Sequence, residues 1–152
     1  MTKIYCDGAC KGNPGYSGSG IIIYKDNKII RMAGAFEESG TNNTAELKAL
    51  IHSLKIAERI NEKCIIKTDS SYSRNSIIEW AYSWKKKGWK KKGGIKNLDL
   101  IKEAHTLYDL LKENVVIEHV KGHAGIEGNE EADKMANYAV ENRIIKWRVI
   151  ND

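Results

Sequence analysis

The stretch from Lys3 to Gly15 constrains the fold more strongly than any other part of this sequence. A short β-prone run from Ile4 to Cys6 stops at Asp7, and residues that favour tight turns follow it at once. The next long apolar run, at 21–24, is close enough along the chain to pair with the first run antiparallel. The stretch therefore predicts a strand that delivers a carboxylate to a polar loop.

A second apolar strand is predicted from Cys64 to Thr68, and it stops at Asp69. The strands after the first three are separated by segments with helical periodicity, and strands joined by helical crossovers are usually parallel. If the strands that end at Asp7 and Asp69 are parallel neighbours, both carboxylates lie at one sheet edge, where open α/β sheets bind ligands. We expect Glu46, at the start of a predicted helix, to approach the same edge.

The order of the predicted elements is that of an α/β fold. Three antiparallel strands come first, with the polar turn Lys25-Asp26-Asn27 between the second and the third. A polar loop at 37–43 follows, and Asn43 with Glu46 three residues later predicts a capping box at the start of the next helix. The full prediction has strands at 4–6, 20–24, 28–36, 64–68 and 115–120, and helices at 44–59, 71–84, 98–112 and 127–142.

The length of 152 residues fits one domain of ordinary size. The N-terminus lacks the pattern of a signal peptide, and no apolar run approaches the ~18 residues of a membrane span. Three cysteines, an odd number without the spacing of a zinc site, favour free thiols in a reducing cytosol. We therefore expect a soluble, cytoplasmic protein without membrane contacts, and a monomer because no repeated apolar surface helix is present.

The formal net charge is +5, and it is unevenly distributed. Between Lys85 and Asn97 the sequence has seven lysines and no acidic residue, so the rest of the chain is slightly acidic. Such a local patch favours a polyanionic partner, and a solvated lysine-rich loop is the alternative.

Four acidic residues form the candidate site: Asp7, Glu46, Asp69 and Asp133. Each of them also has a structural explanation when taken singly. Asp7 fits a turn residue and Glu46 half of a capping box, while Asp69 fits a helix N-cap and Asp133 a solvated helical position. Gathered at one point, four carboxylates would repel one another unless a cation were present. The lack of clustered His and Cys favours Mg²⁺ or Mn²⁺ over zinc, and two such ions suit phosphodiester hydrolysis. His123, in a glycine-rich loop, is a candidate for proton transfer.

In their order and spacing, these residues resemble the bacterial-type (type 1) ribonuclease H family over about residues 3–142. The motifs that carry the resemblance are Asp7-Gly-Ala-Cys-Lys-Gly-Asn-Pro-Gly15, Thr41-Asn-Asn-Thr-Ala-Glu46, Thr68-Asp-Ser70, Trp80 with Trp84-Lys-Lys-Lys-Gly-Trp89, Lys96-Asn-Leu-Asp99, and Val120-Lys-Gly-His-Ala-Gly125 with Asn129 and Asp133. The resemblance implies one catalytic domain at 1–142 with a basic handle at about 84–97, and a C-terminal tail at 143–152. It also implies a five-stranded mixed sheet flanked by helices.

The resemblance further implies a Mg²⁺-dependent endonuclease that cuts the RNA strand of an RNA/DNA hybrid and leaves 3′-hydroxyl and 5′-phosphate ends. The four acids would hold two ions, with Asp7 bridging them, and His123 would assist proton transfer or product release. The implied substrate contacts are Asn13, Asn42 and Asn43 on the minor groove, Thr41 and Asn97 on a DNA phosphate, Trp80 in the channel for the DNA strand, and Lys85, Lys86 and Lys87 on phosphates.

Two positions depart from the family pattern, since Ser39 and Ser71 stand where many members have longer side chains that grip the substrate. The tryptophans also have an alternative, which is packing that holds the handle to its helices. For the whole chain we weigh two alternatives: another nuclease or strand-transfer domain of the wider ribonuclease H-like group, and a noncatalytic nucleic-acid-binding module. The chain could also be a domain of a reverse transcriptase, but we favour a free-standing enzyme.

Overall fold

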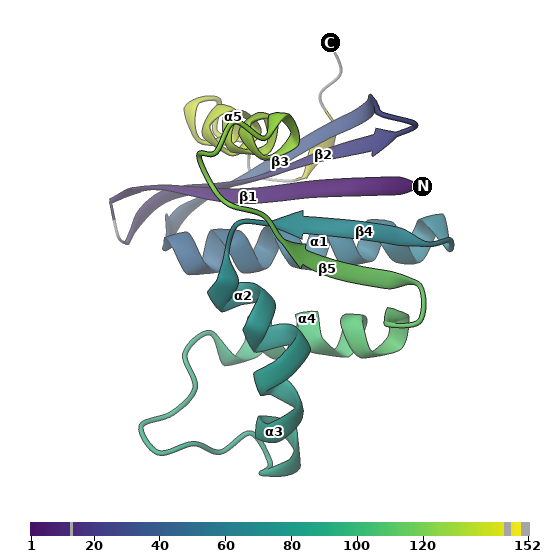
Figure 1. The fold of residues 1–152 in the computed structure, drawn as a ribbon. Coiled ribbons are helices and arrows are strands. Elements are labelled where there is room, and N and C mark those ends of the chain that lie inside the picture. The colour runs from purple at the N-terminus through teal and green to yellow at the C-terminus, as the bar shows by residue number, and fades with distance from the viewer. Residues whose placement is uncertain (13, 145–146, 150–152) are drawn as a thin grey trace.

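A mixed sheet with helices on both faces forms the molecule, as Figure 1 shows. The computed structural model describes residues 1–12, 14–144 and 147–149. The strands are β1 (Thr2–Gly12), β2 (Gly15–Lys25), β3 (Lys28–Gly40), β4 (Cys64–Thr68), β5 (Val115–His119) and β6 (Arg148–Val149). The helices are α1 (Asn42–Ile60), α2 (Ser71–Asn75), α3 (Ala81–Lys86), α4 (Leu98–Leu111) and α5 (Glu127–Glu141), with one wider π-helical turn at Ser76–Trp80 between α2 and α3.

The strand order is β5-β4-β1-β2-β3-β6. β1, β2 and β3 pair antiparallel, whereas β4 pairs parallel with β1 and with β5. The five predicted strands and their mixed pairing are therefore confirmed. β6, which was not predicted, adds two residues antiparallel to β3.

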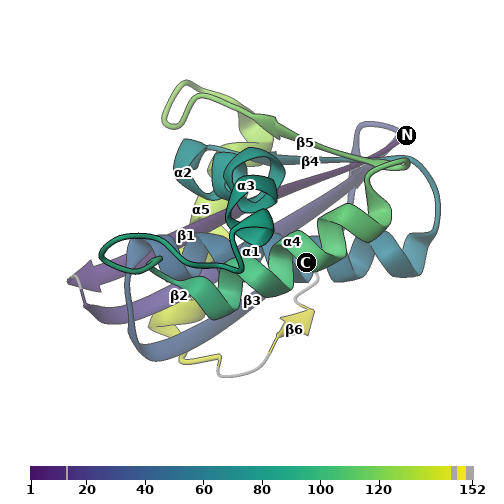
Figure 2. The same ribbon diagram turned by 90° about the horizontal axis from the view of Figure 1, so that it is seen from below.

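One layer of apolar residues lies on each face of the sheet. Helix α1 packs on β1, β2 and β4, and α4 packs on α1, so the larger core lies on this face. Helix α5 covers the opposite face over β1, β2 and β3. Figures 1 and 2 show the consecutive segments α2 and α3 projecting away from the sheet beside α4.

The first three strands are longer than predicted. β1 does not stop at Asp7, because its antiparallel pairing with β2 continues from Asp7 opposite Gly20 to Gly12 opposite Gly15. Only the parallel pairing with β4 ends at Cys6. β3 likewise continues to Gly40, through most of the predicted polar loop. The predicted hairpin turn is confirmed, with Asp26 and Asn27 both in the left-handed region.

The cap of α1 differs from the prediction. Thr41 is the N-cap, and its hydroxyl accepts a hydrogen bond from the Thr44 N–H at 3.1 Å while the Thr44 hydroxyl accepts one from the Thr41 N–H at 2.9 Å. These two residues form the capping box that was predicted for Asn43 and Glu46. Because the helix begins two residues earlier, the Glu46 carboxylate is not used in capping.

Candidate functional site

Three carboxylates meet at one edge of the sheet. The parallel register pairs Cys6 of β1 with Thr68 of β4, so Asp7 and Asp69 are the next residues along two neighbouring strands. Glu46 reaches the same point from the N-terminal part of α1. Each of the three offers an oxygen, and these oxygens all lie within 4.8 Å of one another. Asp69 is not the N-cap of α2, because Ser70 fills that position.

Gly8 permits this close approach of β1 and α1. A Cβ atom at this position would lie 2.6 Å from the Glu46 backbone nitrogen and 2.7 Å from the Ala45 Cβ. The residue after Asp7 must therefore be glycine for the first turns of α1 to contact the strand. The sequence showed this glycine as a turn residue, whereas its role is close packing.

Burial makes the negative charges of this group costly. Asp7 is 5% exposed and Glu46 8% exposed. Burial, together with the nearby Asp69 charge, raises the pKa of Asp7 from about 3.8 to about 7. Burial and the Asp7 carboxylate raise the pKa of Glu46 as well. A bound cation would remove this penalty, because it favours the ionised form of each acid.

The donor set fits a hard divalent cation. All three groups are carboxylates, which Mg²⁺ and Mn²⁺ prefer over the nitrogen and sulfur ligands of zinc sites. Glu46 Oε2 is buried and has no hydrogen-bond partner among the described residues, so one oxygen of the group is left to accept a ligand. The other oxygens are only partly used, since Asp7 Oδ1 accepts the Gly8 N–H at 2.9 Å.

Asp133 lies next to this group but outside the set of oxygens within 4.8 Å that the described residues form. It belongs to α5, which approaches β2 so closely that a Cβ atom at Gly20 would lie 2.4 Å from the Ala132 carbonyl oxygen. Since Gly20 is opposite Asp7 in the sheet, Asp133 is close enough for its charge to contribute to the raised pKa of Asp7. Asp133 is half-buried on α5.

His123 lies on the exposed loop between β5 and α5. The loop starts beside the acidic group, because the Val120 N–H donates to the Thr68 carbonyl at 2.8 Å. His123 has a left-handed backbone with a φ of 54°. The other three histidines lie elsewhere: His52 stacks on Trp147 with ring centroids 4.1 Å apart, His105 is buried with Nδ1 2.7 Å from the Ile77 carbonyl, and His119 is exposed on β5.

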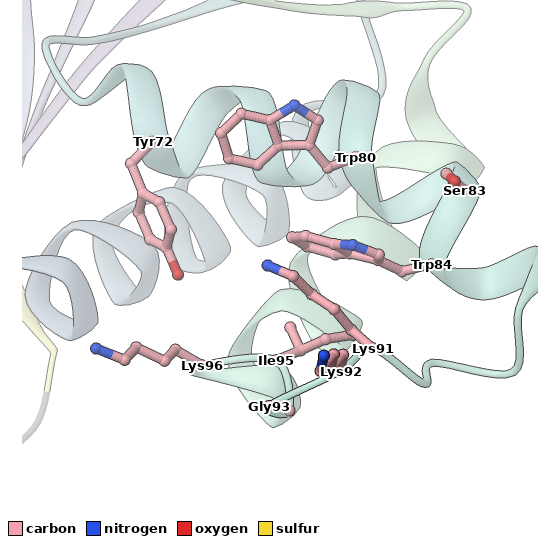
Figure 3. A pocket seen from close by; sticks show the side chains of 10 residues that line it. Tyr72, Trp80, Ser83, Trp84, Lys91, Lys92, Gly93, Ile95 and Lys96 are labelled. Atoms are coloured by element: carbon pink, nitrogen blue, oxygen red, sulfur yellow. The ribbon is translucent and has the colours of Figure 1, made fainter.

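The basic segment and the π-helical turn enclose a cavity of about 660 Å³, shown in Figure 3. Trp80 ends the π-helical turn and remains 39% exposed, with its ring 6.4 Å from Tyr72 and 6.0 Å from Trp84 between centroids. Lys91 Nζ lies 5.8 Å from the centre of the Trp84 ring. Tyr72 lines the cavity although the sequence did not single out this position, and Lys91 comes from the predicted lysine-rich segment.

The predicted lysines and tryptophans divide into two groups. Lys85, Lys86 and Lys87 are exposed at the end of α3. Trp84 and Trp89 are half-buried and pack against the main core, which supports the structural alternative for these two rings.

The remaining predicted contacts lie near helix starts. Asn42 and Asn43 are exposed in the first turn of α1, whereas the Thr41 hydroxyl is engaged in the cap. Asn97 precedes α4 in a left-handed conformation, and its amide donates to the Tyr72 hydroxyl at 3.3 Å. Asn13 lies outside the described residues. Ser39 and Ser71, the two departures from the family pattern, are both exposed.

Comparison with known proteins agrees with this architecture. The family model described as RNase H matches residues 1–141. The chain is 45% identical to ribonuclease H of Francisella philomiragia over 140 residues, which cover 90% of this chain and 88% of that protein. It is 44% identical to ribonuclease H of Francisella tularensis subsp. novicida over 146 residues, which cover 93% and 92% of the two chains.

A solved structure has the same fold. The crystal structure of LC9-RNase H1, described as a type 1 RNase H with the type 2 active-site motif, superposes with a TM-score of 0.83 at 28% identity. The match covers 99% of this chain and 77% of that chain. The fold, the acidic sheet edge and the resemblance seen in the motifs lead to the same result. The chain belongs to the ribonuclease H family.

Proposed function

We propose that the protein is an endonuclease that hydrolyses the RNA strand of RNA/DNA hybrids and leaves 3′-hydroxyl and 5′-phosphate ends. The convergence of Asp7, Glu46 and Asp69 within 4.8 Å is the observation that carries the proposal. A noncatalytic binding module has no need for a buried group of like charges that raises the pKa of its own members.

Asp7, Glu46 and Asp69 would hold divalent ions, Mg²⁺ or in its place Mn²⁺, and Asp133 would complete the set from α5. Two ions in such a site stabilise the attacking and leaving oxygens of an in-line displacement at phosphorus. The protein's own contribution is a rigid arrangement of carboxylates, because strand pairing fixes Asp7 and Asp69 and the capped helix fixes Glu46.

His123 would move a proton to or from the leaving group. An imidazole can accept or donate a proton, and an exposed loop that starts beside Asp69 can bring the ring to the reacting phosphate and withdraw it.

The basic and aromatic segment would hold the DNA strand of the hybrid. Exposed lysines at 85–87 would neutralise phosphates, and Trp80 offers a partly exposed ring in the cavity. Asn13, Asn42 and Asn43 would read the minor groove, where the ribose 2′-hydroxyl distinguishes RNA from DNA. Thr41 and Asn97 would bind a phosphate at the helix starts through backbone N–H groups as well as side chains.

Cleavage of an end-labelled RNA strand tests the proposal. The strand is paired with DNA or with RNA and incubated with Mg²⁺ or with chelator. We expect cutting only in the hybrid and only with metal, and products that a 3′-hydroxyl-dependent polymerase extends. Tight hybrid binding without cutting would instead favour the binding module, and cutting of duplex DNA would favour another nuclease of the wider group.

We also propose a cytoplasmic monomer whose catalytic domain spans residues 1–142, with the tail at 143–152. Cys6, Cys10 and Cys64 are free thiols, which suits a reducing compartment. No helix in the described part of the chain is both long and apolar enough to span a membrane. Light scattering after size exclusion tests the monomer, and activity of a chain ending at Asn142 tests the domain boundary.

A further inference from the structure

A chain of three side chains joins Asp133 to the β1–β2 hairpin. The Asn137 amide nitrogen donates to the Asp133 backbone carbonyl at 2.9 Å and lies 3.4 Å from Asp133 Oδ1. On its other side, Asn137 Oδ1 accepts a hydrogen bond from Lys11 Nζ at 3.0 Å. Neither Lys11 nor Asn137 belongs to the acidic group or to the predicted substrate contacts.

The register of the two elements explains the contact. Asp7 and Lys11 are four residues apart on β1, so their side chains point to the same face of the sheet. Asp133 and Asn137 are four residues apart on α5, so they lie one above the other on one face of the helix. Since α5 packs on this face of β1, the helix pair Asp133 and Asn137 faces the strand pair Asp7 and Lys11.

Lys11 determines which way the Asn137 amide points. An ammonium group has only hydrogens to donate, so it must face the carbonyl oxygen of the amide. The amide NH₂ is then left for Asp133, whose carboxylate has only acceptors. Reversing the amide would place two donors together at Lys11 and two acceptors together at Asp133.

We propose that Asn137 is a positioning residue that orients the Asp133 carboxylate toward the acidic group, and that Lys11 acts through Asn137 by fixing its amide. The proposal rests on the proposed function in one respect, namely that Asp133 takes part in metal binding. It also links the hairpin that contains Lys11 to the fourth carboxylate.

The consequence lies in metal affinity. Asp133 stands apart from the three clustered acids, and its helical backbone allows several side-chain rotamers. A hydrogen bond that selects the productive rotamer lowers the entropy lost when metal binds. Partners of this kind typically change metal affinity by 10–100-fold, and the half-buried position and the 3.4 Å distance place the expected effect near the lower end, on the order of tenfold.

The test measures Mn²⁺ binding by calorimetry without substrate, on the whole chain, for wild type, Asn137→Ala, Lys11→Met and the double variant. We expect Asn137→Ala to weaken Mn²⁺ binding on the order of tenfold and Lys11→Met to weaken it by a smaller factor. In the Asn137→Ala background, Lys11→Met should cause no further loss, because Lys11 acts only through the amide. Thermal unfolding in chelator verifies that the variants fold.

Lys134→Met is the matched control. Lys134 neighbours Asp133 in sequence and carries the same charge, but it is exposed and its ammonium pairs with Glu131 at 3.3 Å. Removing it should leave Mn²⁺ binding unchanged. An equal change in Lys134→Met and Lys11→Met would overturn the proposal, because it would show that Lys11 has no specific role through the Asn137 amide. The proposal would also be overturned if Lys11→Met weakened Mn²⁺ binding by the same factor in wild type and in Asn137→Ala.

Asp133→Asn separates the two hypotheses. If this variant weakens Mn²⁺ binding but Asn137→Ala does not, the positioning role is wrong while the proposed metal site stands. If wild type and Asp133→Asn bind Mn²⁺ equally, Asp133 has no part in the site and the proposed function loses its fourth ligand.

Discussion

At the scale of single residues, Asp69 and Asp7 combine two properties that are usually separate. Each follows directly after a paired strand position, so its backbone is fixed, yet each carboxylate lies beyond the end of the parallel pairing and faces a like charge. Rigid like charges at short distance are costly without a cation. Such a site is maintained for its chemistry and at the expense of stability.

Asp69→Asn should abolish hybrid cleavage, since it removes a negative charge at nearly constant shape. Loss of a group that acts only in the reacting complex appears in the rate and not in the fold, so the thermal midpoint in chelator should not fall. Asp26→Asn is the control, because Asp26 is exposed in a left-handed turn that asparagine tolerates well. Full activity in Asp69→Asn would contradict the proposed site.

At the scale of elements, the position of α5 depends on its contact with β2. Gly20 leaves room for the helix backbone, and the helix then carries Asp133 toward Asp7. Helix α3 differs from α5, because its lysines at 85–87 are exposed at the helix end rather than packed. Helix α5 therefore controls the geometry of the site, and α3 contributes electrostatic attraction for the substrate.

Gly20→Ala should destabilise the protein by about 1–3 kcal/mol, as expected for overpacking. It should also lower the cleavage rate, because the displaced helix moves Asp133. Gly34→Ala offers a graded comparison, since its Cβ atom would lie 3.2 Å from the Ala139 Cβ, a looser contact. Denaturant unfolding and cleavage rates measure both effects. Equal stability of Gly20→Ala and wild type would show that α5 is not held by this contact.

Replacing Lys85, Lys86 and Lys87 together with Gln should weaken hybrid binding and flatten its dependence on salt, by up to about one unit of slope for each lysine that contacts a phosphate. The control replaces Lys25, Lys28 and Lys63 with Gln. These three lysines lie around Thr2, at the start of β1 and away from the acidic group. Binding isotherms at several salt concentrations supply the slope. An unchanged slope in the first variant would exclude these lysines from phosphate contacts.

At the scale of the whole molecule, the acidic group couples stability to pH and metal. Because burial raises the pKa of Asp7 to about 7 and raises that of Glu46, the folded protein binds more protons than the unfolded chain between about pH 4 and pH 7. Without metal, the free energy of unfolding therefore falls as the pH rises through this window, and the loss is complete above the folded pKa values.

In chelator, the thermal midpoint should be higher at pH 5 than at pH 8, and Glu46→Gln should reduce the difference by removing one of the charges. The change in unfolding free energy is on the order of 1–3 kcal/mol, since one pKa unit corresponds to about 1.4 kcal/mol. Added Mg²⁺ should raise the midpoint more at pH 8 than at pH 5. A wild-type midpoint that falls no more between pH 5 and pH 8 than that of Glu46→Gln would contradict this coupling.

The sequence by itself determined the order of the main strands and helices, the hairpin turn at Asp26 and Asn27, and the parallel edge that Asp7 and Asp69 share. Periodicity and turn preferences are properties of neighbouring residues, so they can be read along the chain. The family followed from the motifs in the same way. Strand β4 and the starts of α2, α4 and α5 matched their predicted bounds for this reason.

Tertiary structure alone decided the features that depend on distant partners. Pairing with β2 carried β1 past Asp7, and the Thr41–Thr44 capping box released Glu46 to the site. Packing of α5 on the sheet created the contact between Lys11 and Asn137, which are 126 residues apart. Such contacts form only when folding brings distant parts of the chain together. Strand register and helix position are set by this long-range pairing and not by local propensity, so no local sequence pattern predicts them.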